Sequence, residues 1–200
     1  MLKSRDMEIE IKVLNIDPPS VRQKLKELGA TYQGREFQRN HMYDYADQRL
    51  YREHDGSYIR LRQRYWPDTQ QAEVLLTLKQ TISRDKYKIA EETESTVGDF
   101  QALNQFLVKL GFIQTRIDEK LRETWLLDDL HLEIDQWAGL PPYLEIEAAS
   151  EDAVQRGLNL LGYSAEQSTS ANLTEVLAQY GITAKDLRFA DFGQVLDFEI

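Results

Sequence analysis

The segment EIEIKV at residues 8–13 alternates charged and apolar side chains, and the fold can be inferred from this pattern. Successive side chains point to opposite faces of a β-strand, so Glu8, Glu10 and Lys12 share one face, while the apolar residues share the other. In a single strand, such a pattern usually marks the solvated outer face of a sheet. Its meaning depends on whether other strands repeat it.

Other segments do repeat it, each with long polar side chains at every second position of an otherwise apolar run. They are Tyr58, Arg60 and Arg62; Thr77 and Lys79; Lys120 and Arg122; Glu133 and Asp135; and Glu145 and Glu147. Turn signals such as Asp55-Gly56 and Pro67-Asp68 separate the strand-like runs. Together they predict about eight strands, at roughly 7–13, 37–45, 56–65, 72–80, 86–97, 116–127, 130–137 and 143–149.

Four amphipathic helical runs lie between and after these strands. Each follows a residue suited to capping a helix N-terminus: Asp17, Asp99, Ser150 and Asn172. The first three end in Leu-Gly, at 28–29, 110–111 and 161–162, and the fourth ends at Gly181. Glycine suits the left-handed position after a helix, so these residues predict the helix ends.

The helices need an apolar sheet surface to pack against, and the strands offer one apolar face each. We therefore predict an α+β fold: an eight-stranded antiparallel closed β-barrel, or tunnel, with a charged lumen and helices packed on its outside. The alternative is a sandwich whose charged faces are solvated. We expect a single domain over residues 1–200, with its core at about 7–180 and a C-terminal helix and tail at 172–200.

Composition limits the partners. The chain carries 24 basic and 34 acidic residues, a formal net charge of -10, which disfavours binding to nucleic acid or to anionic membranes. There is no cysteine, no signal peptide and no apolar stretch as long as a membrane span, so we expect a cytoplasmic protein. A site for an anion must then be local and shielded.

The predicted lumen suits a polyanion. Burying about a dozen charges is costly unless they are paired or liganded, so stability alone does not explain them. The basic lumen residues are Lys12, Arg60, Arg62, Lys79, Lys120 and Arg122. Arginine forks bind phosphate oxygens, and carboxylates can hold Mg²⁺ or Mn²⁺ that bridge to phosphates. The set therefore predicts a triphosphate bound together with a divalent cation.

The order of these segments resembles the CYTH superfamily of triphosphate tunnel metalloenzymes, whose signature E-x-E-x-K is similar to Glu8-Ile9-Glu10-Ile11-Lys12. The resemblance covers about residues 7–180. It implies that the six basic residues bind phosphates and that Glu8, Glu10, Lys12 and Lys79 belong to the catalytic set. It also implies metal ligation by Glu8, Glu10, Glu145 and Glu147, with Asp135 assisting, and support of the basic residues by Glu92, Glu94 and Glu133. For Lys86 and Lys88 we favour an exposed edge over a phosphate contact.

The resemblance implies metal-dependent hydrolysis of a triphosphate, with inorganic triphosphate as the expected substrate. The alternatives are a class IV-type adenylyl cyclase making cyclic AMP from ATP, a thiamine triphosphatase and a polyphosphate-binding module without turnover. Cyclases of this type often carry a His-Phe pair before the signature, where this chain has Met7. The histidines and tryptophans are expected to be ordinary surface and packing residues. A homodimer is possible, and the tail at 182–200 either covers one end of the tunnel or mediates dimerisation.

Overall fold

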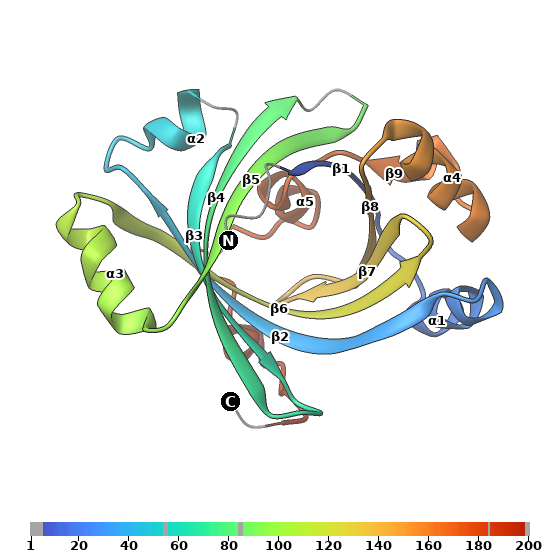
Figure 1. The fold of residues 1–200 in the computed structure, drawn as a ribbon, viewed down its shortest axis with the longest axis horizontal. Helices are drawn as coiled ribbons and strands as arrows, with labels where there is room; N and C mark the ends of the chain where they lie inside the picture. Colours follow the sequence, from blue (N-terminus) through green and yellow to red (C-terminus); the bar gives the residue numbers. More distant parts are fainter. Residues whose placement is uncertain (1–5, 54–55, 84–85, 184, 199–200) are drawn as a thin grey trace.

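A computed structural model describes residues 6–53, 56–83, 86–183 and 185–198 of the 200-residue chain; for residues 6–8 it describes the backbone only. Eight strands form a closed ring (Figure 1). They are β1 (Asp6–Val13), β2 (Thr31–Asp44), β3 (Tyr58–Trp66), β4 (Gln71–Ser83), β5 (Lys88–Val97), β6 (Ile113–Leu127), β7 (Leu130–Trp137) and β8 (Tyr143–Ala148). The ring runs β1-β5-β4-β3-β2-β6-β7-β8 and back to β1, with every pairing antiparallel. The predicted closed barrel is confirmed.

β1 closes the ring because it pairs on both edges. Residues 6–10 pair with β5, and residues 9–13 pair with β8. Lys12 and Val13 extend beyond β5, and the two-residue strand β9 (Ser168–Thr169) pairs with them there. The ring therefore leaves little unpaired backbone along β1.

The outer face of the barrel is apolar and covered by helices. α1 (Pro18–Glu27) and α4 (Glu151–Leu161) pack on β1, β7 and β8, in a core that includes Leu25, Leu132, Ile146 and Leu158. α3 (Phe100–Lys109) packs on the other side of the ring, around Tyr43, Leu61 and Leu107. α5 (Leu173–Gln179) joins a third cluster with β2 and β6. Glycine at position 157 lets α4 approach β8 closely, because a Cβ there would lie 2.9 Å from Ile146 Cγ2.

The helix boundaries follow the predicted caps. The side chains of Asp17, Asp99, Ser150 and Asn172 each accept a hydrogen bond from the backbone N–H three residues later. The glycines after the helices have positive φ, as at Gly162 with φ 83°. The predicted helix ends are therefore confirmed. They could be predicted from the sequence because capping depends on residues only three or four positions apart.

Some elements were not predicted. β2 begins at Thr31 rather than near residue 37, and a short helix, α2 (Arg49–Glu53), follows it. The carboxylate of Asp44 holds the start of α2, accepting from the backbone N–H groups of Leu50 at 3.1 Å and Tyr51 at 3.0 Å. Two 3₁₀ turns, Ala165–Gln167 and Phe189–Phe192, also lie in the C-terminal part.

The C-terminal tail follows the outside of the barrel. Leu187 pairs in parallel with Asp118 of β6, donating to Ile117 O at 2.8 Å and accepting from Glu119 N at 2.7 Å. β7 pairs with β6 only from Lys120 onward. Leu187 therefore pairs with the part of the β6 edge that β7 leaves open. The first residues of α5, which precede the tail, line the tunnel cavity, and the two roles considered for the tail stay predictions. No helix in the described part of the chain is long and apolar enough to cross a membrane.

Candidate active site

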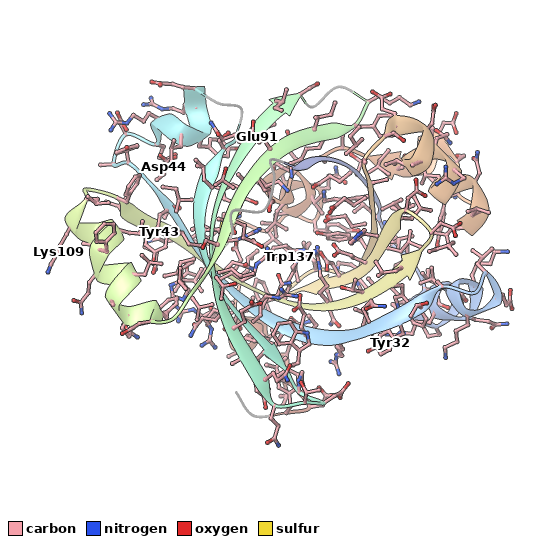
Figure 2. The ribbon with its side chains drawn as sticks, viewed as in Figure 1. Tyr32, Tyr43, Asp44, Glu91, Lys109 and Trp137 are labelled. Atoms are coloured by element: carbon pink, nitrogen blue, oxygen red, sulfur yellow. The ribbon has the colours of Figure 1, made fainter. Side chains whose placement is uncertain are left out.

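The barrel encloses a cavity of about 660 Å³. Its wall is formed by side chains from all eight strands, and residues of α2 and of the start of α5 also line it. Figure 1 shows α5 behind the opening of the ring. Figure 2 shows Trp137 within the ring of strands and Lys109, on α3, outside it. Trp137, predicted to be a packing residue, packs against the core cluster that includes Phe37 and Leu121 and also lines the cavity, where the Lys120 ammonium lies 4.8 Å from its ring centroid.

All six predicted basic residues line this cavity. They are Lys12 on β1, Arg60 and Arg62 on β3, Lys79 on β4, and Lys120 and Arg122 on β6. The two-residue period of each strand turns them inward while the intervening apolar residues face the helices. The structure therefore brings together, from four strands, the basic set that the sequence placed on one face.

Arg62 stands apart within this set. Its Nε donates to Asn40 Oδ1 at 2.8 Å, and no carboxylate in the described part of the chain forms an ion pair with it. Burial, together with repulsion from Arg60 and Arg122, lowers the pKa of the Arg62 guanidinium to about 10. A buried cation that forms no ion pair with the described carboxylates favours an anionic ligand.

Arg60, in contrast, lies near two carboxylates. Its Nη2 is 3.7 Å from Glu92 and 3.8 Å from Glu94, while Glu92 also accepts a close contact of 2.6 Å from Lys79. Burial alone would raise the pKa of Glu92, but Lys79 and Arg60 lower it to about 2. Glu92 and Glu94 thus lie against the basic residues that the sequence assigned to them.

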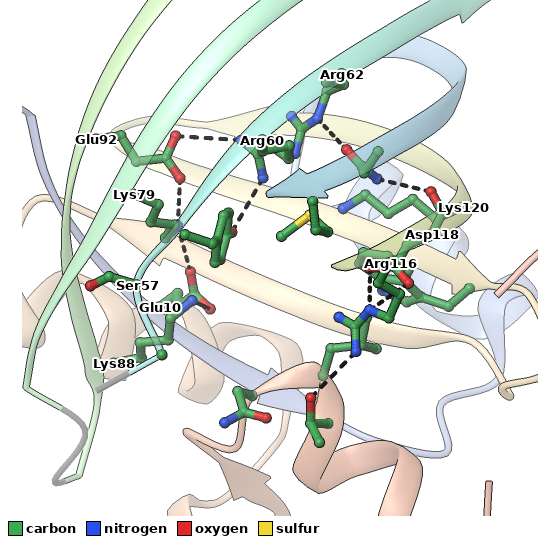
Figure 3. Close-up of a pocket in the computed structure, with 18 of the residues that line it drawn as sticks. Glu10, Ser57, Arg60, Arg62, Lys79, Lys88, Glu92, Arg116, Asp118 and Lys120 are labelled. Atoms are coloured by element: carbon green, nitrogen blue, oxygen red, sulfur yellow. Dashed lines mark hydrogen bonds and ion pairs between the residues drawn. The ribbon is translucent and has the colours of Figure 1, made fainter. Parts of the chain in front are cut away.

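Glu10 lies among three lysines. Its Oε1 is 2.6 Å from Lys12 Nζ and 2.9 Å from Lys88 Nζ. Its Oε2 is 3.5 Å from Lys79 Nζ, and Figure 3 shows Glu10 with Lys79 and Lys88. Burial opposes ionisation of Glu10, but the lysines outweigh it and hold the pKa well below the usual range. The exposed edge favoured for Lys88 is wrong: the side chain is 12% exposed and lines the cavity, whereas Lys86 is exposed.

Asp135 is fully buried and bound to two basic residues. It accepts from Lys120 Nζ at 2.8 Å and from Arg122 Nε and Nη2 at 2.6 Å each. These cations overcome the effect of burial and hold the Asp135 pKa far below its usual value. In this arrangement Asp135 orients Lys120 and Arg122, and the assisting role in metal ligation that the resemblance implies for Asp135 stays a prediction.

Three other carboxylates form a group that fits a cation. Oxygens of Glu133, Glu145 and Glu147 lie within 4.8 Å of one another. Burial, together with repulsion from Asp135 and Glu145, raises the pKa of Glu133 to about 7 against the attraction of Arg122. An all-carboxylate set suits hard ions such as Mg²⁺ or Mn²⁺. Glu133, predicted as a supporting residue, belongs to this group. The Glu8 side chain lies outside the described residues, so its predicted role stays a prediction.

Sequence reasoning missed a group near α5. Asn40, Arg116 and Asp118 line the cavity; Arg116 Nε lies 2.8 Å from Asp118 Oδ1, and Asn40 Nδ2 donates to Asp118 O at 3.4 Å (Figure 3). Burial raises the pKa of Asp118 to about 6. The available signal was the period of β6, which puts residues 116 and 118 on the same face as 120 and 122. From the other side, Asn172, Leu173 and Thr174 at the start of α5 border the same cavity.

Comparisons with known proteins agree with this architecture. A Methanocaldococcus jannaschii protein named "Putative adenylate cyclase MJ0240" is 30% identical over 146 residues, which make up 73% of this chain and 79% of that protein. The structure of a "putative adenylate cyclase" from Vibrio parahaemolyticus matches with a TM-score of 0.73 at 12% identity, covering 88% of this chain and 99% of that chain. A Hippeastrum structure, described as "putative adenylyl cyclase HpAC1" with a dominant triphosphatase activity, matches with a TM-score of 0.55 at 19% identity over 98% of each chain.

The two structural matches show a shared fold at low identity. The family model described as the CYTH domain matches residues 6–169, from the start of β1 through β9. That range includes every strand of the closed barrel and all the carboxylates and basic residues of its cavity described above. The chain therefore belongs to the CYTH domain family.

Proposed function

We propose that this protein is a metal-dependent triphosphatase whose substrate is inorganic triphosphate. The observation that carries the proposal is the Arg62 guanidinium, which lies in the cavity with Asn40 as its polar partner and with no carboxylate ion pair among the described residues. Arg60, Lys120 and Arg122 add further positive charge to the same cavity. A chain of phosphates would supply the missing negative charge.

Residues on different strands of the cavity wall would have different roles in the reaction. Arg60 and Arg62 on β3 and Lys120 and Arg122 on β6 would neutralise charge on the phosphoryl group as it is transferred. Asp135 fixes Lys120 and Arg122 in place through three short contacts, so they need not reorganise during the reaction. Positioning and fixed charge account for most catalysis of phosphoryl transfer.

The carboxylates Glu133, Glu145 and Glu147 would hold the divalent ion. Bound there, Mg²⁺ or Mn²⁺ would polarise water and neutralise phosphate charge. Arg122 contacts both Glu133 and Glu145, the latter at 3.2 Å, and so connects the carboxylate group to the phosphate-binding side. The triphosphatase activity described for the Hippeastrum relative supports this choice of reaction.

A second candidate, adenylyl cyclase, is favoured by the size of the cavity and by the name of the archaeal relative. A volume of about 660 Å³ falls within the range that commonly holds drug-sized organic ligands, and so it could take a nucleoside as well as phosphates. The same argument applies to thiamine triphosphate.

The test is a substrate panel of inorganic triphosphate, thiamine triphosphate, ATP and long-chain polyphosphate, each with Mg²⁺ and with Mn²⁺. We expect phosphate release, fastest from inorganic triphosphate, and loss of that activity in Arg62→Gln but not in Arg52→Gln, which changes an exposed arginine on α2. Cyclic AMP as the product from ATP would favour the cyclase. Tight binding with no turnover under either metal would favour a polyphosphate-binding module.

A further inference from the structure

Lys88 lines the cavity and does not lie on the exposed edge that the sequence favoured for it. It is the first residue of β5, and the register of the closing seam puts it directly opposite Glu10 of β1. Its Nζ lies 2.9 Å from Glu10 Oε1, the same oxygen that Lys12 contacts at 2.6 Å. Two ammonium groups thus share one carboxylate oxygen inside a largely buried wall.

The counter-charges around this point are unequally divided. Lys12 has a second carboxylate, Glu145, at 3.2 Å, and Lys79 has a second carboxylate, Glu92, at 2.6 Å. For Lys88, Glu10 is the one ion-pair partner within the described part of the chain. One negative charge therefore serves Lys88, which has no other carboxylate partner among the described residues, and also serves Lys12 and Lys79.

Buried like charges repel each other strongly because little solvent screens them. A phosphate group carries more negative charge and more acceptor oxygens than a carboxylate, so it can satisfy several ammonium groups at once. In the absence of phosphate, Glu10 supplies that negative charge from within the chain. Phosphate would compete with Glu10 for the three lysines. Lys88 has the fewest other carboxylate partners among the described residues, so it would be stabilised most by the phosphate charge.

We propose that Lys88 is a phosphate-binding residue of the tunnel and that Glu10 holds it, together with Lys12 and Lys79, until a phosphate group of the substrate replaces the carboxylate. This proposal deepens the proposed function and rests on its triphosphate site. It adds a seventh basic residue, at the seam between β1 and β5, to the six that the sequence indicated. It also gives Glu10 a role that requires no metal ligation.

Lys86 provides a matched control. It lies two residues before Lys88, outside β5, and its side chain is exposed beside the ring of Tyr87. Lys86→Gln and Lys88→Gln make the same change in net charge at nearly the same point in the chain. Any difference between them therefore reports the position of the lysine in the cavity rather than the overall charge of the protein.

The experiment is calorimetric titration with inorganic triphosphate in EDTA, so that binding is measured without metal or turnover. We expect Lys88→Gln to bind about 10- to 100-fold more weakly, as for loss of a hydrogen bond to a charged group, and Lys88→Arg to recover most of the affinity. Lys86→Gln should bind as wild type does, since an exposed charge is screened. Glu10→Gln should bind more tightly, because it removes the competing carboxylate.

A measurement on the wild type guards against variants that fail to fold. Inorganic triphosphate should slow acetylation of Lys88, followed by peptide mass spectrometry, while leaving acetylation of Lys86 unchanged. Equal affinities of Lys88→Gln and Lys86→Gln, or no protection of Lys88, would overturn the proposal even if the wild type hydrolyses triphosphate. If the wild type has no hydrolytic activity but Lys88→Gln selectively loses affinity for inorganic triphosphate, the result would support the role of Lys88 and refute the proposed reaction. A wild type that neither binds nor hydrolyses triphosphate would overturn both.

Discussion

Asp135→Asn tests whether Asp135 orients basic residues rather than binding metal. Asp135 is fully buried and contacts Lys120 once and Arg122 twice, at 2.8, 2.6 and 2.6 Å. Asparagine keeps the shape of the side chain but removes the charge, and it can turn an N–H donor toward these cations. Two buried cations then lose their shared counter-charge.

Removing one partner of a buried ion pair costs about 3–5 kcal/mol, which is a large part of the 5–15 kcal/mol that stabilises an ordinary domain. The depressed pKa of Asp135 gives this loss a pH dependence. The stabilisation is full above the ordinary carboxyl pKa of 3.8 and is lost as the pH falls through the lower folded-state pKa. At pH 7 the variant should therefore show nearly the whole loss of stability.

The assay is urea unfolding at pH 7 in EDTA, comparing midpoints and slopes. The control is Asp129→Asn, the same substitution in an ion pair with Arg156 whose two side chains are 60% and 47% exposed. We expect its midpoint to match that of the wild type, because exposed pairs contribute little. Asp135→Asn should also weaken metal-free triphosphate binding. The reasoning is refuted if the two variants unfold at the same urea concentration, or if Asp135→Asn changes affinity for metal alone.

Three further predictions follow from single features. Arg62→Lys keeps the charge but loses the planar fork, so kcat/KM for inorganic triphosphate should fall about tenfold; an unchanged value would show that Arg62 makes no bidentate contact. In EDTA, raising the pH from 4.5 to the Glu133 pKa of about 7 should destabilise the wild type relative to Glu133→Gln, because in this range the native state keeps a proton that the unfolded chain has lost. Parallel urea midpoints for the two proteins across that range would contradict this. Gly139→Ala should destabilise the protein by about 1–2 kcal/mol because of the φ of 79° alone. The loss of stability should be larger because the new Cβ would lie 2.5 Å from the Phe192 ring. Proteolysis of the tail should accelerate, and resistance equal to that of the wild type would refute the contact.

Local pattern was enough to predict the barrel. A β-strand turns every second side chain to the same face whatever its neighbours are, so the charged face of β1 could be identified before any partner strand was known. Helix caps such as Asp99 and Ser150 act over three residues and were equally visible. The closed ring was then the arrangement that buries the apolar faces beneath the helices.

Elements that depend on contacts between residues far apart in the sequence could not be predicted from the sequence. α2 starts where the Asp44 carboxylate accepts from the backbone at residues 50 and 51, an arrangement that the five-residue helix alone does not signal. Leu187 has no strand pattern around it, and it pairs because β7 leaves part of the β6 edge open. In both cases the partner is set by the three-dimensional path of the chain.

The alternation of side chains along each strand already shows which residues face the lumen, whereas the pairing of the strands in the folded barrel fixes which of these residues are in contact. Asp135 and Glu133 share one face of β7, yet the register sets Asp135 opposite Arg122 and Glu133 opposite Glu145. One carboxylate therefore orients cations and the other joins a candidate metal site. Lys88 lies in the cavity because β5 pairs with β1 at Glu10, whereas Lys86 precedes that pairing. Side-chain alternation is a property of one strand, but register is a relation between two strands that the closure of the barrel fixes.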